Sequence, residues 1–155
     1  MSLGGGGGGG AMQEIQQQME ALEQEKQAIE AEIEGVRERQ SEIDEAVEAI
    51  ETLETGSTVQ VPIGGGAYVR AEVQDIDEVV VGLGGGYAAE QDQDGAIDAL
   101  ERKRDALDDR ISELQEEVAE VETETEQLEQ RAQQMQQQQM QQMMQQQQQQ
   151  GGDDE

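Results

Sequence analysis

Apolar side chains recur at alternating intervals of three and four residues over two long stretches of the chain. In the first stretch, residues 12–54, the repeat runs from Ile15 to Ile50 without a break. With Ile15 at position d of a heptad, every d position is Ile, Leu or Val, while Lys26 and Gln40 occupy a positions. Sustained a/d heptads of this kind predict a helix that packs against another helix as a coiled coil.

The second stretch, residues 95–135, repeats in the same way. Two helices on either side of a compact insert are expected to fold back on each other as an antiparallel pair. Reflection about the insert places Lys26 near Thr125 and Arg104 near Glu45. Polar residues at seam positions lower stability but fix the register of the two helices.

Between the helices, residues 55–94 change to a period of two. Two glycine clusters, residues 64–66 and 84–86, separate short apolar stretches and predict two β-hairpins with glycine turns. The expected strands cover residues 57–63, 67–74, 79–83 and 87–90. Pro62 marks the first strand as an edge strand or the site of a bulge. The predicted fold class is α+β.

The hairpins need partners, because an isolated two-stranded hairpin is marginal in water and free edges must be paired or covered. The chain has no Phe and no Trp from which a local core could be built. We therefore predict an obligate oligomer in which the hairpins form an inter-subunit β-barrel. The residues expected at these contacts are Val59, Val61, Ile63, Val69, Ala71, Val73, Val79, Val81 and Leu83.

The two ends differ in composition from the rest of the chain. Residues 1–11 are rich in glycine and lack the charged and apolar regions of a signal peptide, so a disordered tail is expected. Residues 136–155 form a second tail, rich in Gln and Met and acidic at its end. The predicted organisation is therefore one domain over residues 12–135, flanked by two tails.

The charge of the chain restricts its partners. Thirty-seven acidic and nine basic residues give a net charge of −28. Without a basic surface, binding to nucleic acid or to an anionic membrane is not expected. Self-repulsion of this size is screened by molar salt, where the Debye length is about 3 Å, and so favours a high-salt cytoplasm, with an ordinary acidic coiled coil as the alternative. No apolar stretch reaches the length needed to span a membrane, and a cytoplasmic location is predicted.

The residue types exclude several kinds of chemistry. Because the chain has no Cys and no His, disulfides, zinc sites and Ser-His or Cys-His nucleophile pairs are impossible. Residues 82–87 resemble a phosphate-binding loop only in part, since no helix follows them. The spacing from Glu90 to Glu101 follows that of a calcium-binding EF-hand loop, but a strand is expected before it, so an acidic loop with Asp94 as a helix cap is the favoured interpretation. We predict neither a cofactor nor an enzyme, and leave calcium open.

Methionine is concentrated where the two helices are expected to end together. Met is flexible and polarizable and suits apolar surfaces that bind many sequences, although core filling remains an alternative. The residues predicted to bind unfolded chains at this tip are Met12, Ile15, Met19, Leu128, Met135, Met140, Met143 and Met144.

The hairpin segments also resemble a known family. The sequence LETGSTVQVPIG, from Leu53 to Gly64, followed by Tyr68-Val69 and by Gly85-Gly86-Tyr87, is similar to the hairpins of the alpha-type subunits of prefoldin. The resemblance covers about residues 15–130, and the acidity is similar to that of halophilic archaeal members.

The resemblance implies a hexamer of two alpha and four beta subunits whose β-barrel platform carries coiled-coil tentacles. It also implies that the tips hold unfolded polypeptide without ATP and transfer it to a group II chaperonin. The function expected is therefore that of an ATP-independent holding chaperone subunit. The alternative is a coiled-coil scaffold or tether without client binding, which explains the heptads but not the methionines.

Overall fold

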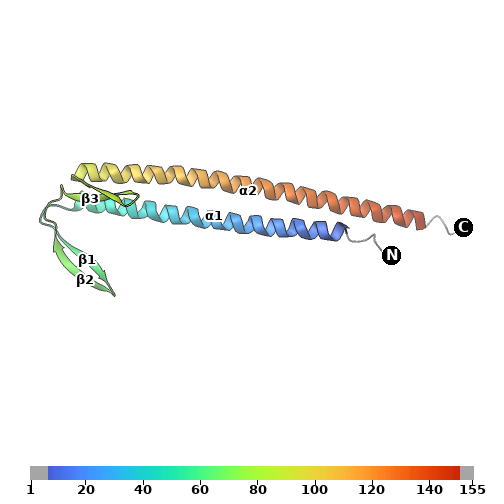
Figure 1. Cartoon of the computed structure of the whole chain (residues 1–155), viewed down its shortest axis with the longest axis horizontal. Helices are drawn as coiled ribbons and strands as arrows, with labels where there is room; N and C mark the ends of the chain where they lie inside the picture. Colours follow the sequence, from blue (N-terminus) through green and yellow to red (C-terminus); the bar gives the residue numbers. More distant parts are fainter. Residues whose placement is uncertain (1–6, 151–155) are drawn as a thin grey trace. The chain divides into compact units, whose positions relative to one another are not determined.

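A computed structural model of the chain describes residues 7–150, and its elements follow the predicted order (Figure 1). They are α1 (Gly7–Thr52), β1 (Thr58–Gly64), β2 (Ala67–Glu72), β3 (Val79–Gly84), β4 (Tyr87–Gln91) and α2 (Gln93–Gln150). The predicted α+β class, with two long helices and two antiparallel hairpins, is confirmed.

The chain divides into two compact units, and both helices contribute to each of them. One unit contains the N-terminal part of α1 up to Ile33 and the part of α2 from Glu113 onward. The other contains residues Glu34–Ser112, which include the end of α1, the four strands and the start of α2.

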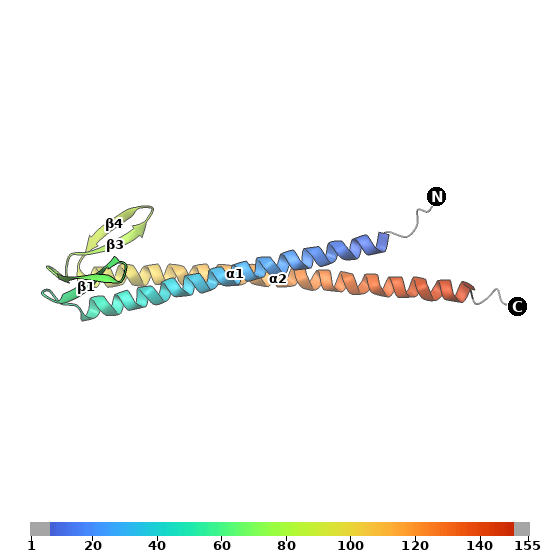
Figure 2. The same ribbon diagram turned by 90° about the horizontal axis from the view of Figure 1, so that it is seen from below.

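In the first unit, α1 and α2 run antiparallel and bury the predicted seam (Figure 2). Its buried side chains are Ile15, Ile29, Ile33, Leu114 and Val121. Leu114 has no exposed surface at all. Burial of such a side chain contributes about 1.5–3 kcal/mol. Every seam position predicted in both helices is buried or half-buried across the two units, which confirms the heptad assignment.

The ion pairs between the helices give the register. Lys26 Nζ lies 3.1 Å from Glu122 Oε1, one turn before the predicted neighbour Thr125. In the second unit, Arg104 Nε lies 2.8 Å from Asp44 Oδ1, next to the predicted Glu45. The observed partners differ from the residues predicted by reflection. Residues on one face of a helix recur only every three or four positions, so each side chain pairs with the nearest suitable residue on the facing turn.

A polar layer interrupts the seam of the second unit at Gln40, whose side chain is 9% exposed. Its Nε2 donates to the backbone carbonyl of Arg104 at 3.2 Å and to Asp108 Oδ1 at 2.5 Å. Gln40 thus connects α1 to α2 through two hydrogen bonds, and its role in fixing the register stays a prediction.

The first hairpin pairs β1 with β2. Val59 faces Ala71 and Val61 faces Val69, so the aliphatic residues share one side of the sheet, as expected. The register shifts between Pro62 and Gly64, in agreement with the bulge that was one of the two alternatives predicted from Pro62. β2 ends at Glu72, so the prediction of a strand through residue 74 was wrong. Beyond Glu72 the backbone turns toward β3, and Val73 pairs only with the loop residues Gly56 and Ser57.

The second hairpin, β3 with β4, packs against the helices of its own unit. Val81 is buried and forms a small core with Ala96 and Ala99, flanked by Ile50 and Val79. In addition, Lys103 Nζ donates to the backbone carbonyl of Gly82 at 2.9 Å. The side of this hairpin that contains Val81 is therefore covered by the chain itself.

The two turns need glycine for a conformational reason. All three residues of the cluster 64–66 have positive φ, with values of 109°, 59° and 80°. The cluster 84–86 repeats this pattern, with values of 92°, 63° and 82°. Residues with a Cβ rarely adopt these angles, and each cluster joins two antiparallel strands, so the glycines are hairpin-turn residues.

The helices join the hairpin region through side-chain caps. α2 begins one residue after Asp92, whose Oδ1 accepts a hydrogen bond from the Gly95 amide at 2.7 Å. Asp92 is thus the N-cap, and the prediction of Asp94 was wrong because Asp94 already lies inside the helix. Gln93 Nε2 donates to the Ile50 carbonyl at 2.8 Å and satisfies an acceptor in the last turn of α1.

Both helices extend further into the tails than predicted. α1 begins at Gly7, within the predicted glycine tail, and α2 continues to Gln150 instead of ending near Met135. Gln is a good helix former, so α2 does not need apolar seam residues to continue. The helices are consequently unequal, with 46 and 58 residues. The remaining tail residues, 1–6 and 151–155, lie outside the described part of the chain.

Candidate functional site

Among the side chains described, those of residues 9–150, large apolar groups are exposed in two places. Seven are on the strands, and we call them the hairpin surface: Val61, Ile63, Tyr68, Val69, Val80, Leu83 and Tyr87. Three are near the end of α2, and we call them the methionine face: Met140, Met143 and Met144. Exposed apolar groups in clusters commonly mark interaction sites, so these two surfaces are the candidate functional sites.

The hairpin surface overlaps the predicted contact residues in part. Val61, Ile63, Val69 and Leu83 are exposed, as a docking surface requires. The other predicted residues are covered to different degrees: Val59, Ala71, Val73 and Val79 are half-buried, and Val81 is buried.

The sequence reasoning missed three members of the hairpin surface, namely Tyr68, Val80 and Tyr87. Tyr68 and Val80 lie on the opposite side of the alternation from the residues selected, which is the signal that could have found them. Tyr87 lies on β4, from which no residue had been selected. Each sheet has only two strands within the described residues, so every strand also presents one unpaired backbone edge. The hairpins thus offer apolar side chains and free hydrogen-bonding groups together.

The methionine face is a compact stripe on one side of α2. Residues spaced by three and four positions lie next to each other on a helix, as Met140, Met143 and Met144 do. Their exposed fractions are 67%, 68% and 65%. Continuation of the seam repeat beyond Met135 gives Gln139 and Gln142, so these methionines are outside the seam.

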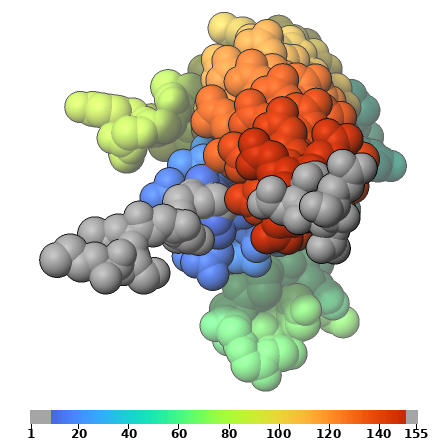
Figure 3. Space-filling view, turned by 90° about the vertical axis from the view of Figure 1, so that its right-hand side faces the viewer, coloured from blue at the N-terminus to red at the C-terminus, as the bar shows by residue number. Residues whose placement is uncertain are grey.

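The end of α2 also extends past the start of α1. Counted back from the pair Lys26–Glu122, the antiparallel alignment places Gly7 opposite about Gln141. Much of the orange-to-red surface of α2 accordingly faces the viewer in the space-filling view of Figure 3. By this alignment Met143 and Met144 lie beyond the first described turn of α1.

The other residues predicted for client binding are less accessible. Ile15 is only 5% exposed, in the seam of the first unit. Met12, Met19, Leu128 and Met135 are half-buried. The structure thus brings three of the eight predicted residues together on one exposed face and places the other five in or beside the seam.

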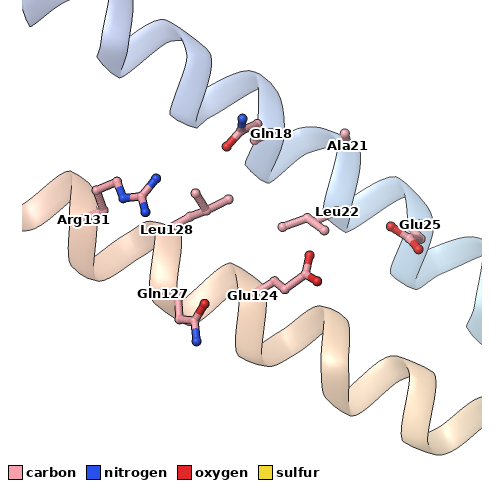
Figure 4. A pocket seen from close by; sticks show the side chains of 8 residues that line it. All are labelled: Gln18, Ala21, Leu22, Glu25, Glu124, Gln127, Leu128 and Arg131. Carbon is pink, nitrogen blue, oxygen red and sulfur yellow. The ribbon is translucent and has the colours of Figure 1, made fainter.

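Leu128 contributes to an open groove between the helices of the first unit (Figure 4). The groove has a volume of about 330 Å³, and Leu22 of α1 and Leu128 of α2 point toward each other across it. The rest of its lining is mainly polar or charged: Gln18, Ala21, Glu25, Glu124, Gln127 and Arg131. It is a surface depression of the coiled coil with a small apolar floor.

The electrostatics of the first unit centre on Lys26. Its hydrogen bond to Glu122 and the charge of that carboxylate raise the pKa of the lysine above its ordinary value of 10.5. Glu30 and Glu23 act in the same direction, while desolvation opposes them. The protonated lysine is therefore the form that the coiled coil stabilises.

The described residues offer no metal site and no membrane span. Within residues 7–150, no group of three or more acidic side chains is arranged to hold a metal ion. Glu90 lies in β4, whereas Asp94 and Glu101 lie on α2, so the EF-hand spacing does not form a calcium loop. Neither described helix has a segment apolar enough to cross a membrane.

The order helix, two β-hairpins, helix defines a class of coiled-coil proteins that carry small sheets between two long helices. The family model described as prefoldin subunit matches residues 15–138. The chain belongs to the prefoldin family, and the resemblance found in its hairpins is confirmed.

Similar proteins come mainly from halophilic archaea. The chain is 75% identical over 72 residues to prefoldin subunit alpha of Halorubrum lacusprofundi, covering 46% of this chain and 47% of that protein. It is 69% identical over 97 residues to prefoldin subunit alpha of Haloarcula marismortui, covering 63% of each. The match thus spans about half to two thirds of these relatives.

A solved structure is also similar. A chain in the cryo-EM structure of filamentous PFD from Methanocaldococcus jannaschii aligns with a TM-score of 0.50 and 29% sequence identity. The alignment covers 76% of this chain and 94% of the other.

Proposed function

We propose that the chain is the alpha subunit of a cytoplasmic prefoldin complex that holds unfolded polypeptide without ATP and transfers it to a group II chaperonin. The observation that carries this proposal is the methionine face, with three apolar side chains 65–68% exposed and outside the seam. Membership of the prefoldin family supports it. A coiled-coil scaffold has no need of an exposed methionine stripe.

The hairpin surface is the proposed contact with other subunits. Ile63 and Leu83, exposed by 66% and 58%, would each be removed from water by a neighbouring sheet. Burial of apolar area is favourable by about 25 cal/mol per Å². Pairing of the free strand edges would satisfy the remaining backbone groups. We propose a β-barrel shared with prefoldin beta subunits, in a complex of two alpha and four beta subunits.

Client binding would use many weak contacts. Methionine side chains adapt to different apolar partners because they are unbranched and have three rotatable bonds. A complex with several such helix ends gains avidity when one client contacts more than one of them. The abundant carboxylates would keep the loaded complex soluble, and high salt would screen their mutual repulsion.

The test is suppression of aggregation. An unrelated denatured protein is diluted in high salt into the complex purified from its source, without nucleotide, and light scattering is followed. We expect suppression at near-stoichiometric complex. Absence of suppression by an intact complex would refute the holding function and favour the scaffold.

A variant then tests the location of the client surface. Changing Met140, Met143 and Met144 to Ser is expected to abolish most of the holding and leave assembly, measured by size-exclusion chromatography, intact. A matched control changes three exposed glutamines of the same helix end to Ser. The control residues are Gln138, Gln141 and Gln145. Equal holding by the two variants would show that clients bind elsewhere.

A further inference from the structure

We propose that the methionine face is a peroxide-sensitive site whose oxidation to sulfoxides releases bound polypeptide or prevents its capture. The inference rests on the proposed holding function, and it adds a form of regulation to the same surface. It concerns three thioethers only, those of Met140, Met143 and Met144.

The first observation is selective exposure. The three sulfurs belong to side chains that are 65–68% exposed, whereas Met12, Met19 and Met135 are half-buried beside the seam. Oxidation of methionine by a dissolved oxidant depends on access to the sulfur. The chain contains no Cys, so no thiol of its own competes for the oxidant. The methionine face is thus the part of the described chain that peroxide should modify first.

The second observation is the neutral surroundings. From residue 132 to residue 150 the helix contains only Gln, Met and one Ala, and Arg131 is the nearest charged residue on α2. Elsewhere the chain is strongly acidic, with a net charge of −28. An acidic protein repels anionic oxidants, but hydrogen peroxide is uncharged and reaches the sulfur without electrostatic repulsion.

The chemistry requires only the peroxide. The sulfur lone pair attacks one oxygen of hydrogen peroxide, a sulfur–oxygen bond forms and the oxygen–oxygen bond breaks. The leaving hydroxide takes up the proton of the transferred oxygen, so the products are one sulfoxide and one water. The sulfur loses two electrons and the peroxide gains them, and methionine sulfoxide reductases can reverse the change.

The structural consequence is confined to the surface. A sulfoxide is polar, so the oxidised stripe no longer offers a client an apolar contact. Because the three methionines lie outside the seam, the helix pair does not have to accommodate the added oxygens. We expect a loss of roughly twofold in client affinity for each sulfoxide, and about eightfold for all three. Assembly and helix content should remain the same.

The experiment uses the intact complex in high salt. Limited treatment with hydrogen peroxide is followed by peptide mass spectrometry, circular dichroism and the light-scattering assay. We expect sulfoxide at Met140, Met143 and Met144 before Met12, Met19 and Met135, with holding lost in parallel and restored by methionine sulfoxide reductase. Because holding is measured before oxidation, failure of the proposed function is seen separately as absence of suppression by the untreated complex.

Two matched variants make the inference falsifiable. Leu replaces the thioether with an apolar group that peroxide does not oxidise. Holding after treatment is compared with holding before treatment within each variant. M140L/M143L/M144L should keep whatever holding it shows before treatment, whereas M12L/M19L/M135L should lose holding on oxidation as the unmodified sequence does. The inference is overturned if the untreated complex holds clients but the first variant loses holding on oxidation as readily as the unmodified sequence. It is equally overturned if the seam methionines oxidise first.

Discussion

Leu114 is the side chain whose removal should destabilise the coiled coil most clearly. It has no exposed surface and lies in the seam of the first unit. The substitution Leu114→Ala removes three buried carbon atoms without introducing a polar group or changing the helix propensity unfavourably. Its effect therefore measures the packing of the seam itself.

The size of the effect follows from burial. At about 0.8 kcal/mol for each buried methylene, loss of three carbons gives about 2.4 kcal/mol. The cavity left between the helices increases this, because neighbouring side chains fill it only in part, so we expect about 3–4 kcal/mol in total. For a protein of this size, 3 kcal/mol corresponds to a decrease in Tm of roughly 6–12 °C. Leu128→Ala, at a half-buried position beside the open groove, is expected to cost about 1 kcal/mol.

Urea unfolding followed by far-ultraviolet circular dichroism provides the measurement. The unmodified protein, Leu114→Ala and Leu128→Ala are compared at one protein concentration, because association with other subunits changes apparent stability. The slope of free energy against urea should be unchanged, with the midpoint shifted. A loss for Leu114→Ala no larger than that for Leu128→Ala would contradict the assignment of Leu114 to the centre of the seam.

Two further predictions concern polar residues of the seam. Gln40→Leu should raise the free energy of unfolding by about 1 kcal/mol and loosen the register, because a buried seam amide specifies alignment at some loss of stability. Urea unfolding with hydrogen exchange tests this, and a less stable variant would show that the bonds of Gln40 outweigh apolar packing. For Lys26→Met, the stability difference from the unmodified protein should be constant from neutral pH to about 10.5 and shrink above it. The folded state raises the pKa of Lys26. The stabilising effect of the lysine is therefore present while it is protonated in both the folded and the unfolded state, and is lost as the folded lysine deprotonates. A stability difference that grows above pH 10.5 would contradict this reasoning.

The helical part of the fold could be predicted from the sequence because its signal is repeated many times. Each seam residue from Ile15 to Ile50 supports the same register, so one polar exception such as Gln40 does not disturb the assignment. The turns could also be predicted, since three consecutive glycines allow the positive φ angles that these turns adopt. Pro62 was a weaker signal, because the register shift beside it also occurs between Gly82 and Gly84, where there is no proline.

The errors arose where a boundary depends on one contact. Asp92 and Asp94 have the same capping chemistry, and only the position of the Gly95 amide distinguishes them. The part of α2 beyond Met135 was missed because Gln carries no periodic signal, although it favours helix.

The candidate site was recovered less completely than the fold. Met140, Met143 and Met144 could be recognised as lying outside the seam, but burial of Ile15 and Val81 depends on neighbours far apart in sequence. Tyr68 and Tyr87 were missed because the choice of strand face followed aliphatic residues only.

The two tyrosines have a practical consequence. They are the only aromatic residues of the chain, one lies on each hairpin, and both are well exposed. In the absence of tryptophan, all intrinsic fluorescence of this subunit therefore originates in the hairpins, and Tyr→Phe at one of them isolates the emission of the other. The sequence thus contains two separate optical probes, which can report in real time whether its two sheets engage their neighbours together or one after the other.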